Sequence, residues 1–559
     1  MKQFLFACIL FCCMNSCSYG QGRTGFSGNI FNDPAVQKMS IALAAIERLY
    51  VDTINSNKLA EDAIIALLEK LDPHSSYMTA EEVKKADEPL QGNFDGIGIQ
   101  FNMFTDTLYV VQVIAGGPSE KVGLLAGDKI IYVNDTLIAG IKMKDYDIVS
   151  KLKGPKGTTV NVKILRKGSP QLLDFKIVRD KIPVYSVNSS YMVDEKNGYI
   201  KIDRFAATTY QEFKEALGKL QAQGMENLIL DLQRNSGGYL GASIELSNEF
   251  LNPGSLIVYT EGVNQSKEEW KANNKGSFKD GRLVVLVDEY SASASEIVSG
   301  AIQDWDRGVI VGKRTFGKGL VQRPIPLPDG SMIRLTTAYY YTPTGRSIQK
   351  PYTKGDLESY HKELIDRYNR GEMISADSIH FPESLKYNTL TKNRIVYGGG
   401  GIMPDYFVPV DTTGALFIAG TTPLYREIID YRGILYKYTR TAIEANRKKY
   451  QEQYPDFDSF RKNFTATDNM LNDMLNIYKK EKAEELKEAT YQLTEEQQGD
   501  LEKSKWLFIY WIKALIAREI YGENEYDQLL NPLLDTYKKA VEIISNEKEY
   551  NKLLNQDRK

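Results

Sequence analysis

The feature that most restricts the fold is an alternation of short apolar strands with helical patterns between residues 195 and 345. The apolar segments NLILDL, RLVVLVD and GVIVG are shorter than ordinary helices, and segments with helical spacing separate them. Strands that alternate with helices build a sheet covered by helices, with functional loops at the strand ends. This part of the chain is therefore predicted to form an α/β core.

The segments on either side of this core differ from it in the spacing of their apolar residues. A cap-then-proline signal at Asp33 and Pro34 opens a helical segment, and residues 95–180 consist of short alternating strands separated by turn residues. Beyond about residue 420 the spacing is helical, and the apolar piece WLFIYWIKALIA, interrupted by Lys513, is predicted to be a core helix rather than a membrane span. The predicted fold is multidomain α+β, with the domains 1–20 signal peptide, 21–32 linker, 33–90 N-terminal helical domain, 91–180 β domain, 181–415 α/β core and 416–559 C-terminal helical region.

The N-terminal segment has the pattern of a secretory signal peptide. One basic residue, Lys2, precedes an apolar run from Phe4 to Met14, and small residues follow. Two cleavage sites stay open: after Gly20, where SYG suits ordinary cleavage, or before Cys17, where MNSC suits lipid modification. We slightly favour lipidation. The sequence thus predicts an exported, periplasmic protein, with membrane attachment through a lipidated Cys17 left open.

Composition excludes several classes of function. Charged residues make up 26% of the chain with both signs mixed, and the net charge of −3 gives no basic surface for nucleic acid. All four cysteines lie within the first 17 residues, so a disulfide scaffold, a catalytic thiolate and a thiolate metal site are excluded for the exported domains. None of the three histidines begins an HExxH motif, and no G-x-S-x-G elbow occurs. No metal and no cofactor are predicted.

One motif resembles a phosphate-binding loop. The segment GKRTFGKG, residues 312–319, matches G-x-x-x-x-G-K, but Gly319 stands where the magnesium-binding hydroxyl should be. The following residues, LVQRPIPL, alternate like a strand and contain two prolines, whereas a phosphate loop opens a helix. Nucleotide binding is therefore not predicted, and Lys318 is left for another role.

A serine and this lysine form a candidate catalytic pair. Local pattern alone makes Ser293 the N-cap of a helix, because Glu296 completes a capping box, and makes Lys318 a solvated loop lysine. A cap and a nucleophile are compatible, since a helix N-terminus also stabilises negative charge that develops on a substrate. A serine hydroxyl needs a base, and a lysine whose pKa is lowered by burial can serve as one. Spacing alone leaves both interpretations open.

Several long motifs, taken in order, resemble those of the C-terminal processing peptidases, which are serine peptidases with a Ser/Lys dyad and an inserted PDZ domain. The resemblance covers about residues 34–410. It is carried by LDPHSSYM (71–78) in the helical domain, GIGIQF (96–101) and GGPSEKVGLLAGDKIIYVND (116–135) in the PDZ domain, and LILDLQRNSGGYL (228–240), SASASEIVSGAIQD (291–304), GKRTFGKGLVQ (312–322) and YGGGGIMPDYFVP (397–409) in the core. It implies a crotonase/ClpP-like α/β peptidase core.

The resemblance also implies roles for individual residues. It makes Ser293 the nucleophile, Lys318 its general base and Gln322 the residue that orients the lysine amine. The implied oxyanion donors are backbone N–H groups, those of Ala294 and of Gly237 or Gly238. Three further residues are expected to be structural: Ser295 as the helix cap, Asp304 at the helix end and His74 packed in a turn.

In the PDZ domain, the resemblance implies binding of a peptide C-terminus. The loop formed by Gly96, Ile97, Gly98 and Ile99 would present N–H groups to the terminal carboxylate while the peptide adds to the sheet edge. Arg166, at the end of a strand, is a candidate for coupling that docking to the active site.

The predicted function is an exported serine endopeptidase that captures the free C-terminal tails of proteins and cleaves them by acyl-enzyme chemistry. The alternative is a catalytically inactive periplasmic PDZ scaffold that binds protein C-termini. A homodimer, the role of residues 416–559, the substrate, and whether the dyad is preassembled or switched on by the PDZ domain stay open.

Overall fold

The apolar strands of the core assemble into one six-stranded sheet. The computed structural model describes residues 32–104, 106–114 and 116–555. Neighbouring strands from β11 to β21 pair in parallel, and β10 is antiparallel to β11. Every residue of β12, β15 and β16 is buried, as a sheet covered on both faces requires. In order across the sheet, the strands are β10 (Val187–Met192), β11 (Asn197–Ile202), β12 (Asn227–Asp231), β15 (Leu283–Val287), β16 (Val309–Gly312) and β21 (Tyr406–Phe407).

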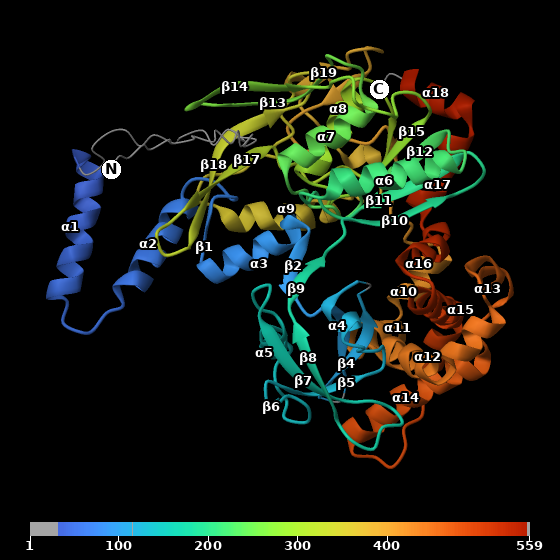
Figure 1. Ribbon diagram of the computed structural model, residues 1–559. Helices are drawn as coiled ribbons and strands as arrows, with labels where there is room; N and C mark the ends of the chain where they lie inside the picture. Colours follow the sequence, from blue (N-terminus) through green and yellow to red (C-terminus); the bar gives the residue numbers. More distant parts are fainter. Residues whose placement is uncertain (1–31, 105, 115, 556–559) are drawn as a thin grey trace, which may run out of the picture. The chain divides into compact units, whose positions relative to one another are not determined.

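Three helices cover one face of this sheet, and they follow the positions predicted from the sequence. They are α6 (Thr209–Ala222), α7 (Leu240–Phe250) and α8 (Ala294–Asp304). Their apolar residues form a single core with the sheet, in which Phe213, Leu246 and Val298 are fully buried. Figure 1 labels the three helices and the strands β10, β11, β12 and β15 of this sheet. The predicted alternation of strands and helices is confirmed.

The last two helices of the described chain cover the opposite face. They are α17 (Asp535–Ser545) and α18 (Glu547–Asn555), whose side chains Ile543, Ile544 and Leu553 pack against β12, β15 and β16. The Tyr550 hydroxyl lies within hydrogen-bonding distance of the backbone of Leu283. The sequence grouped residues 416–559 as one helical region, but these two helices belong to the α/β core, because the sheet needs a second apolar cover.

Truncation of one of these side chains is expected to destabilise the core. Ile543 is fully buried, so Ile543→Ala leaves a cavity beneath the sheet and should lower the free energy of unfolding by about 2–5 kcal/mol. Urea denaturation followed by tryptophan fluorescence measures the change. Lys548→Ala, an exposed position on α18, is the matched control and should change the free energy by less than about 0.5 kcal/mol. A small effect at Ile543 would contradict the assignment of α17 to the core.

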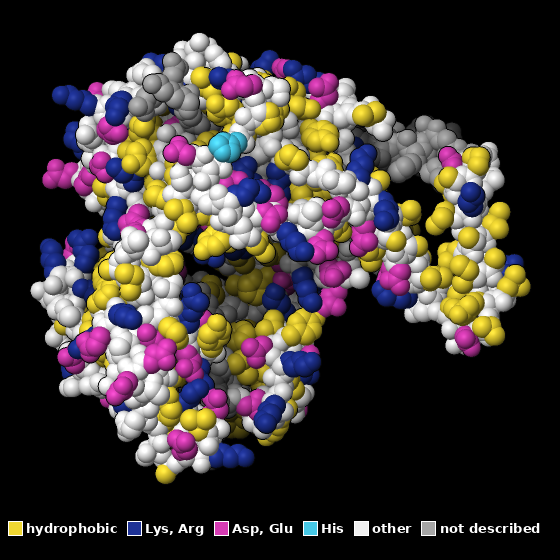
Figure 2. Space-filling model, turned by 180° about the vertical axis from the view of Figure 1, so that it is seen from behind, with side chains coloured by type: hydrophobic (Ala, Val, Ile, Leu, Met, Phe, Trp, Pro, Cys, Tyr) yellow, Lys and Arg dark blue, Asp and Glu magenta, His cyan; other side chains and the backbone are white. Residues whose placement is uncertain are grey.

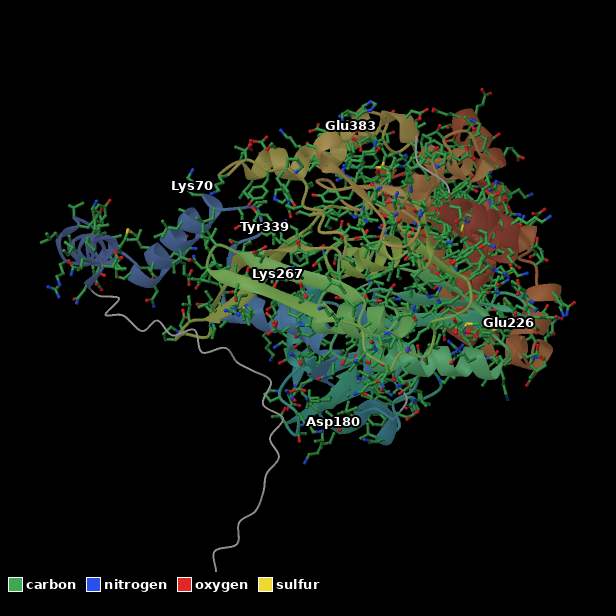
Figure 3. All side chains as sticks on the ribbon, turned by 90° about the horizontal axis from the view of Figure 1, so that it is seen from above. Lys70, Asp180, Glu226, Lys267, Tyr339 and Glu383 are labelled. Atoms are coloured by element: carbon green, nitrogen blue, oxygen red, sulfur yellow. The ribbon has the colours of Figure 1, made fainter. Side chains whose placement is uncertain are left out.

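A second sheet lies beside the first and carries the strand that follows the Lys318 loop. Its order is β1–β18–β13–β14, and β17 also pairs with β18. Lys267 and Tyr339 mark β14 and β18 in Figure 3. The strands are β1 (Ser76–Met78), β13 (Leu256–Gly262), β14 (Gln265–Lys271), β17 (Leu320–Pro326) and β18 (Met332–Tyr341). The strand predicted after the Lys318 loop is therefore confirmed.

The segment LDPHSSYM enters this second sheet. Ser76 pairs with Arg334, and the Asp72 carboxylate accepts a hydrogen bond from Thr336 Oγ1 at 2.9 Å. Helix α3 (Ala80–Gln91) follows, with a complete capping box at Thr79. Residues from Leu68 onward belong to the large compact unit, so the boundary lies inside the predicted helical domain 33–90.

The β domain is an insertion with a core of its own. Strands β2 (Asn93–Gly96) and β9 (Asp180–Pro183) pair where the chain enters and leaves it. Its buried side chains include Leu108, Ile130 and Val160. The remaining elements are β3 (Ile99–Phe104), β4 (Thr107–Val113), α4 (Pro118–Lys121), β5 (Lys129–Val133), β6 (Thr136–Leu137), α5 (Asp145–Leu152), β7 (Thr159–Leu165) and β8 (Leu173–Val178).

The N-terminal unit consists of α1 (Pro34–Leu49) and most of α2 (Ser56–Glu69). The predicted cap is confirmed, since Asp33 Oδ1 accepts a hydrogen bond from the Ala35 N–H at 2.8 Å. No residue of α1 is buried. Exposed apolar side chains lie along it, among them Ile41 and Leu49. Figure 2, which colours hydrophobic side chains yellow, shows many of them on this unit.

The remaining helices form a bundle with a separate apolar core that includes Tyr478, Phe508 and Ile512. They are α10 (Ala415–Thr421), α11 (Pro423–Arg426), α12 (Ile434–Gln453), α13 (Phe457–Asn463), α14 (Asp468–Leu486), α15 (Glu495–Ile520) and α16 (Glu523–Leu530). An insertion before the bundle contains α9 (Leu357–Asn369), β19 (Lys386–Asn388) and β20 (Ile395–Tyr397). Within the ranges given above, no helix has the length and apolar character needed to cross a membrane.

Candidate active site

Ser293 stands at the start of α8 in a strained backbone conformation. Its φ of 54° and ψ of −111° are rare for a residue with a side chain, and such strain concentrates at functional sites. Its N–H donates to Glu296 Oε2 at 2.8 Å, and its carbonyl accepts from the Glu296 N–H. The capping-box glutamate is thus in place. The capping box is complete, because the Ser293 side chain also faces the Glu296 N–H at the start of the helix.

The prediction that Ser295 caps this helix is wrong. The structure makes Ser293 the N-cap, while Ser295 lies inside the first turn. The Ser295 hydroxyl donates to the carbonyl oxygen of Asn235 at 2.8 Å. This serine therefore ties α8 to the glycine-containing loop 235–238, a tertiary contact that local spacing could not reveal.

Lys318 lies in the loop between β16 and β17. Its N–H donates to Glu296 Oε2 at 2.9 Å, the same oxygen that accepts from the Ser293 N–H. Burial lowers the pKa of the Lys318 ammonium below its ordinary value of 10.5, and the nearby Arg334 charge lowers it further. Within the described part of the chain, Ser293 Oγ and Lys318 Nζ form no direct hydrogen bond. One carboxylate oxygen therefore fixes the backbone of both predicted dyad residues.

Glu296 is the residue whose importance the sequence did not reveal. It is fully buried on α8, and its two oxygens accept four hydrogen bonds. Besides Ser293 and Lys318, the donors are the Thr315 hydroxyl at 2.6 Å and the Gly317 N–H at 2.7 Å. Burial raises the pKa of Glu296, and these donors oppose that shift because they stabilise the ionised form. The only sequence signal was its place in the capping box.

Gln322 lies on β17 opposite Thr336 on β18. Its side-chain Nε2 is buried and has no hydrogen-bond partner in the described structure. A buried amide left without a partner costs free energy, which is tolerated where function requires it. The structure records no hydrogen bond between Gln322 and Lys318, so the predicted orienting contact stays a prediction.

Two of the predicted oxyanion donors, the backbone N–H groups of Ala294 and Gly238, have no recorded acceptor among the described residues. The N–H of Gly237 is not available, because it donates to Asn235 Oδ1 at 2.9 Å. Of the two predicted glycine donors, the structure therefore favours Gly238 and contradicts Gly237. A Cβ at Gly237 would lie 2.8 Å from the Cβ of Ser293, so a glycine is required there for close approach.

His74 packs in a turn, as predicted, but it also lies close to the candidate base. Its N–H donates to Asp72 Oδ1, and its Nε2 lies 2.7 Å from the Tyr360 hydroxyl. Burial lowers the pKa of His74 to about 4, and the Lys318 charge adds to the effect. His74 is therefore neutral at pH 7. Its proximity to Lys318 could not be foreseen, because the two residues are far apart in the sequence.

Asp304 has the structural role that was predicted. Its carboxylate pairs with the Arg346 guanidinium at 2.6 Å, and both side chains are fully buried. It also accepts hydrogen bonds from the N–H and the hydroxyl of Thr344. These contacts anchor the end of α8.

The loop predicted to bind a terminal carboxylate, residues 96–99, connects β2 to β3. The carbonyl oxygens of Ile97 and Gly98 accept hydrogen bonds from Ser119 and Ile114. The N–H groups of Ile97 and Gly98 have no acceptor within the described residues, and Gly98 has a φ of 76°. Strand β3 is the edge of its sheet, so a peptide strand can add there.

The side chain of Arg166 forms its recorded hydrogen bonds with residues of the inserted β domain. Its guanidinium donates to both oxygens of Asp128, at 2.8 and 2.7 Å, and to the carbonyl of Gly123. It lines a cavity of about 800 Å³ together with residues of α12 and α15, among them Arg440 and Glu519. The contacts recorded for Arg166 thus give no support to the predicted coupling with the active site, which stays a prediction.

Comparisons with known proteins agree with this architecture. Residues 196–359 match Peptidase family S41, residues 96–177 match a PDZ domain, and residues 424–522 match a family of unknown function, DUF8443. The chain is 40% identical over 305 residues to the carboxy-terminal-processing protease of Bartonella bacilliformis. This match covers 54% of this chain and 69% of that protein. It is 35% identical over 361 residues to the carboxy-terminal processing protease CtpA of Bacillus subtilis, covering 64% and 75%.

A solved photosystem II D1 C-terminal processing protease is 29% identical, with a TM-score of 0.32, and covers 56% of this chain and 89% of that one. The matches to Peptidase family S41 and to a PDZ domain, with the curated relatives, show a serine-type peptidase with an α/β core and an inserted PDZ domain, as the sequence predicted. The chain belongs to the carboxy-terminal processing protease family.

Proposed function

We propose that the protein is an exported endopeptidase that captures C-terminal tails with its PDZ domain and cleaves peptide bonds through a Ser293/Lys318 acyl-enzyme. The observation that carries the mechanism is the Glu296 carboxylate, one oxygen of which accepts hydrogen bonds from the N–H groups of both residues. This shared acceptor supports the mechanism, because the serine has a strained backbone and the lysine has a lowered pKa.

The chemistry follows from these groups. Neutral Lys318 takes the Ser293 hydroxyl proton as the serine oxygen attacks the peptide carbonyl, and the N–H groups of Ala294 and Gly238 stabilise the oxyanion. Lys318 then gives the proton to the leaving amine, so the bond that breaks is the peptide C–N bond. Water then attacks the ester carbonyl while Lys318 takes a proton from it, and Lys318 returns that proton to the Ser293 oxygen as the acyl–oxygen bond breaks and the second product leaves. Gln322 orients the lysine amine by accepting a hydrogen bond from it.

Tail capture uses the PDZ domain. The terminal carboxylate binds the N–H groups of Ile97 and Gly98, while the tail pairs with β3 as an added strand. Because main-chain hydrogen bonds supply this affinity, the substrate class is an unstructured polypeptide with a free C-terminus.

Export and assembly are further parts of the proposal. The signal-peptide pattern and Cys17 support export and lipid attachment, and both lie outside the described residues. The exposed apolar side chains of α1 support association with a second copy, since a helix with no buried residue gains stability when its apolar face is covered.

The test is incubation of the mature protein with a disordered polypeptide that ends in apolar residues. The wild-type protein should cleave it, and Ser293→Ala should bind it without cleavage. Amidation of the polypeptide C-terminus removes the carboxylate charge and should raise KM. Binding without cleavage by the wild-type protein would favour the alternative of an inactive PDZ scaffold.

A further inference from the structure

Helix α9 contacts the Lys318 loop although most of it lies beyond residue 359, where the match to Peptidase family S41 ends. The Arg367 guanidinium on this helix donates from Nη1 to the Thr315 carbonyl oxygen at 2.7 Å and from Nη2 to the Phe316 carbonyl oxygen at 3.0 Å. The Arg367 side chain is 1% exposed, so both bonds form away from water. These carbonyls directly precede Gly317 and Lys318.

The bonds from Arg367 complete the contacts that fix the loop. The Glu296 carboxylate accepts hydrogen bonds from two backbone N–H groups of the loop, those of Gly317 and Lys318. On its carbonyl side, Arg367 donates two bonds, and the Lys350 N–H donates to the Gly317 oxygen at 2.9 Å. A loop without regular structure must find partners for its buried backbone groups elsewhere. Its conformation therefore depends on both charged side chains.

The orientation of Arg367 is itself fixed. Its Nε donates to Glu363 Oε1 at 2.7 Å, one helical turn away. The planar guanidinium thus binds a carboxylate and two carbonyls at once, which the single ammonium of a lysine cannot do in this geometry. Glu363 also pairs with Lys350 at 3.1 Å and with Arg314 at 3.6 Å, so it keeps cationic partners when Arg367 is replaced.

The same helix reaches a second part of the site. Tyr360 places its hydroxyl 2.7 Å from His74 Nε2. The Lys350 ammonium contacts two aromatic rings, 4.2 Å from the centroid of Phe316 and 4.0 Å from that of Tyr360. Helix α9 therefore contacts both the loop that carries Lys318 and the histidine near it.

We propose that α9 is a positioning element of the active site, in which Arg367 holds the Lys318 loop by its two bonds to the Thr315 and Phe316 carbonyl oxygens. The proposal rests on the proposed Ser293/Lys318 mechanism. Arg367 is a positioning residue, since it contacts the backbone of the loop and not the reacting atoms.

The test compares Arg367→Gln with the wild-type protein. With the two bonds lost, kcat and the rate of Ser293 labelling by a fluorophosphonate probe should fall by about 10- to 100-fold, because small displacements of a catalytic group are costly. KM for the tail substrate should stay within about twofold, since the PDZ domain is untouched. The acid limb of the pH–rate profile should move to higher pH, because water that reaches a looser loop stabilises the ammonium form of Lys318.

Two further variants make the test decisive. Arg370→Gln removes a half-exposed arginine that binds Glu372 at 2.9 Å and lies 3.7 Å from Glu363 but has no recorded bond to the loop, so it should keep wild-type rates. Arg367→Lys keeps the charge beside Glu363 but can bond only one carbonyl, so its rates should be intermediate. If folded Arg367→Gln keeps the wild-type kcat, labelling rate and acid limb, the inference is overturned. If Arg367→Gln does not fold, wild-type rates in Arg367→Lys overturn it instead.

The outcomes also separate this inference from the proposed function. If the wild-type protein is active and the Arg367→Gln variant is equally active, only the proposed positioning role of α9 is disproved. If the wild-type protein neither cleaves the tail substrate nor is labelled at Ser293, the proposed function itself is disproved.

Discussion

Lys318→Met should reduce peptide cleavage by at least about 10³-fold while the protein stays folded. The substitution keeps an unbranched side chain of similar length but removes the amine that accepts the Ser293 proton, and general-base catalysis typically contributes factors of this size. Burial already disfavours the ammonium form of Lys318, so an apolar replacement should leave the thermal midpoint unchanged or raise it. Initial rates with the tail substrate and a thermal melt measure both effects.

The wild-type pH profile gives an independent check on the same group. A general base acts in its neutral form, so kcat should rise with pH through the pKa of Lys318. That pKa is lowered from 10.5 by burial and by Arg334, so the limb should appear below the pH at which an exposed lysine titrates. The residual activity of Lys318→Met should lack this limb. A variant that keeps more than about a tenth of the activity, with the limb intact, would rule out Lys318 as the base.

Glu296→Gln should lower both activity and stability. The carboxylate accepts from four donors, and an amide offers one oxygen and turns an NH2 group toward two of them. Because at least one buried N–H group then loses its acceptor, the free energy of unfolding should fall by about 2–4 kcal/mol. Since Ser293 and Lys318 are both fixed by this side chain, kcat should fall by about 10²- to 10³-fold.

The matched control for this substitution is Glu245→Gln on the neighbouring α7. Glu245 is exposed, so the same change in charge and shape should alter stability by less than about 0.5 kcal/mol and leave kcat unchanged. Kinetics with the tail substrate and urea denaturation of both variants supply the comparison. If folded Glu296→Gln keeps kcat within about threefold of the wild-type protein, the carboxylate does not position the two residues.

Much of the architecture could be predicted because it depends on local pattern. Apolar runs such as those of β12 and β15 are readable as buried strands, and Asp33 before Pro34 marks the start of α1. The pair Ser293 and Lys318 was predicted because long motifs occur in family order, not because spacing alone singled it out. Local pattern gave Ser293 a cap role, which it also has.

Other parts of the site could not be predicted because they depend on contacts between distant segments. The choice between Gly237 and Gly238 is decided by Asn235 Oδ1, which occupies one N–H group. Ser295 was misassigned because its partner is a carbonyl in another loop. Spacing cannot show which of two neighbouring backbone groups a folded loop leaves without a partner.

The sequence by itself determined the elements of this protein, the identity of the predicted dyad and the order of the domains, because helix and strand periodicities and family motifs are local. Only the tertiary structure decided how the dyad is held. Glu296, Arg367 and His74 come from three separate segments and lie near the Lys318 loop. Helices α17 and α18, at the end of the described chain, pack against the central sheet. The physical reason is that buried polar groups and exposed sheet faces must find partners, and those partners are chosen by the fold rather than by proximity along the chain.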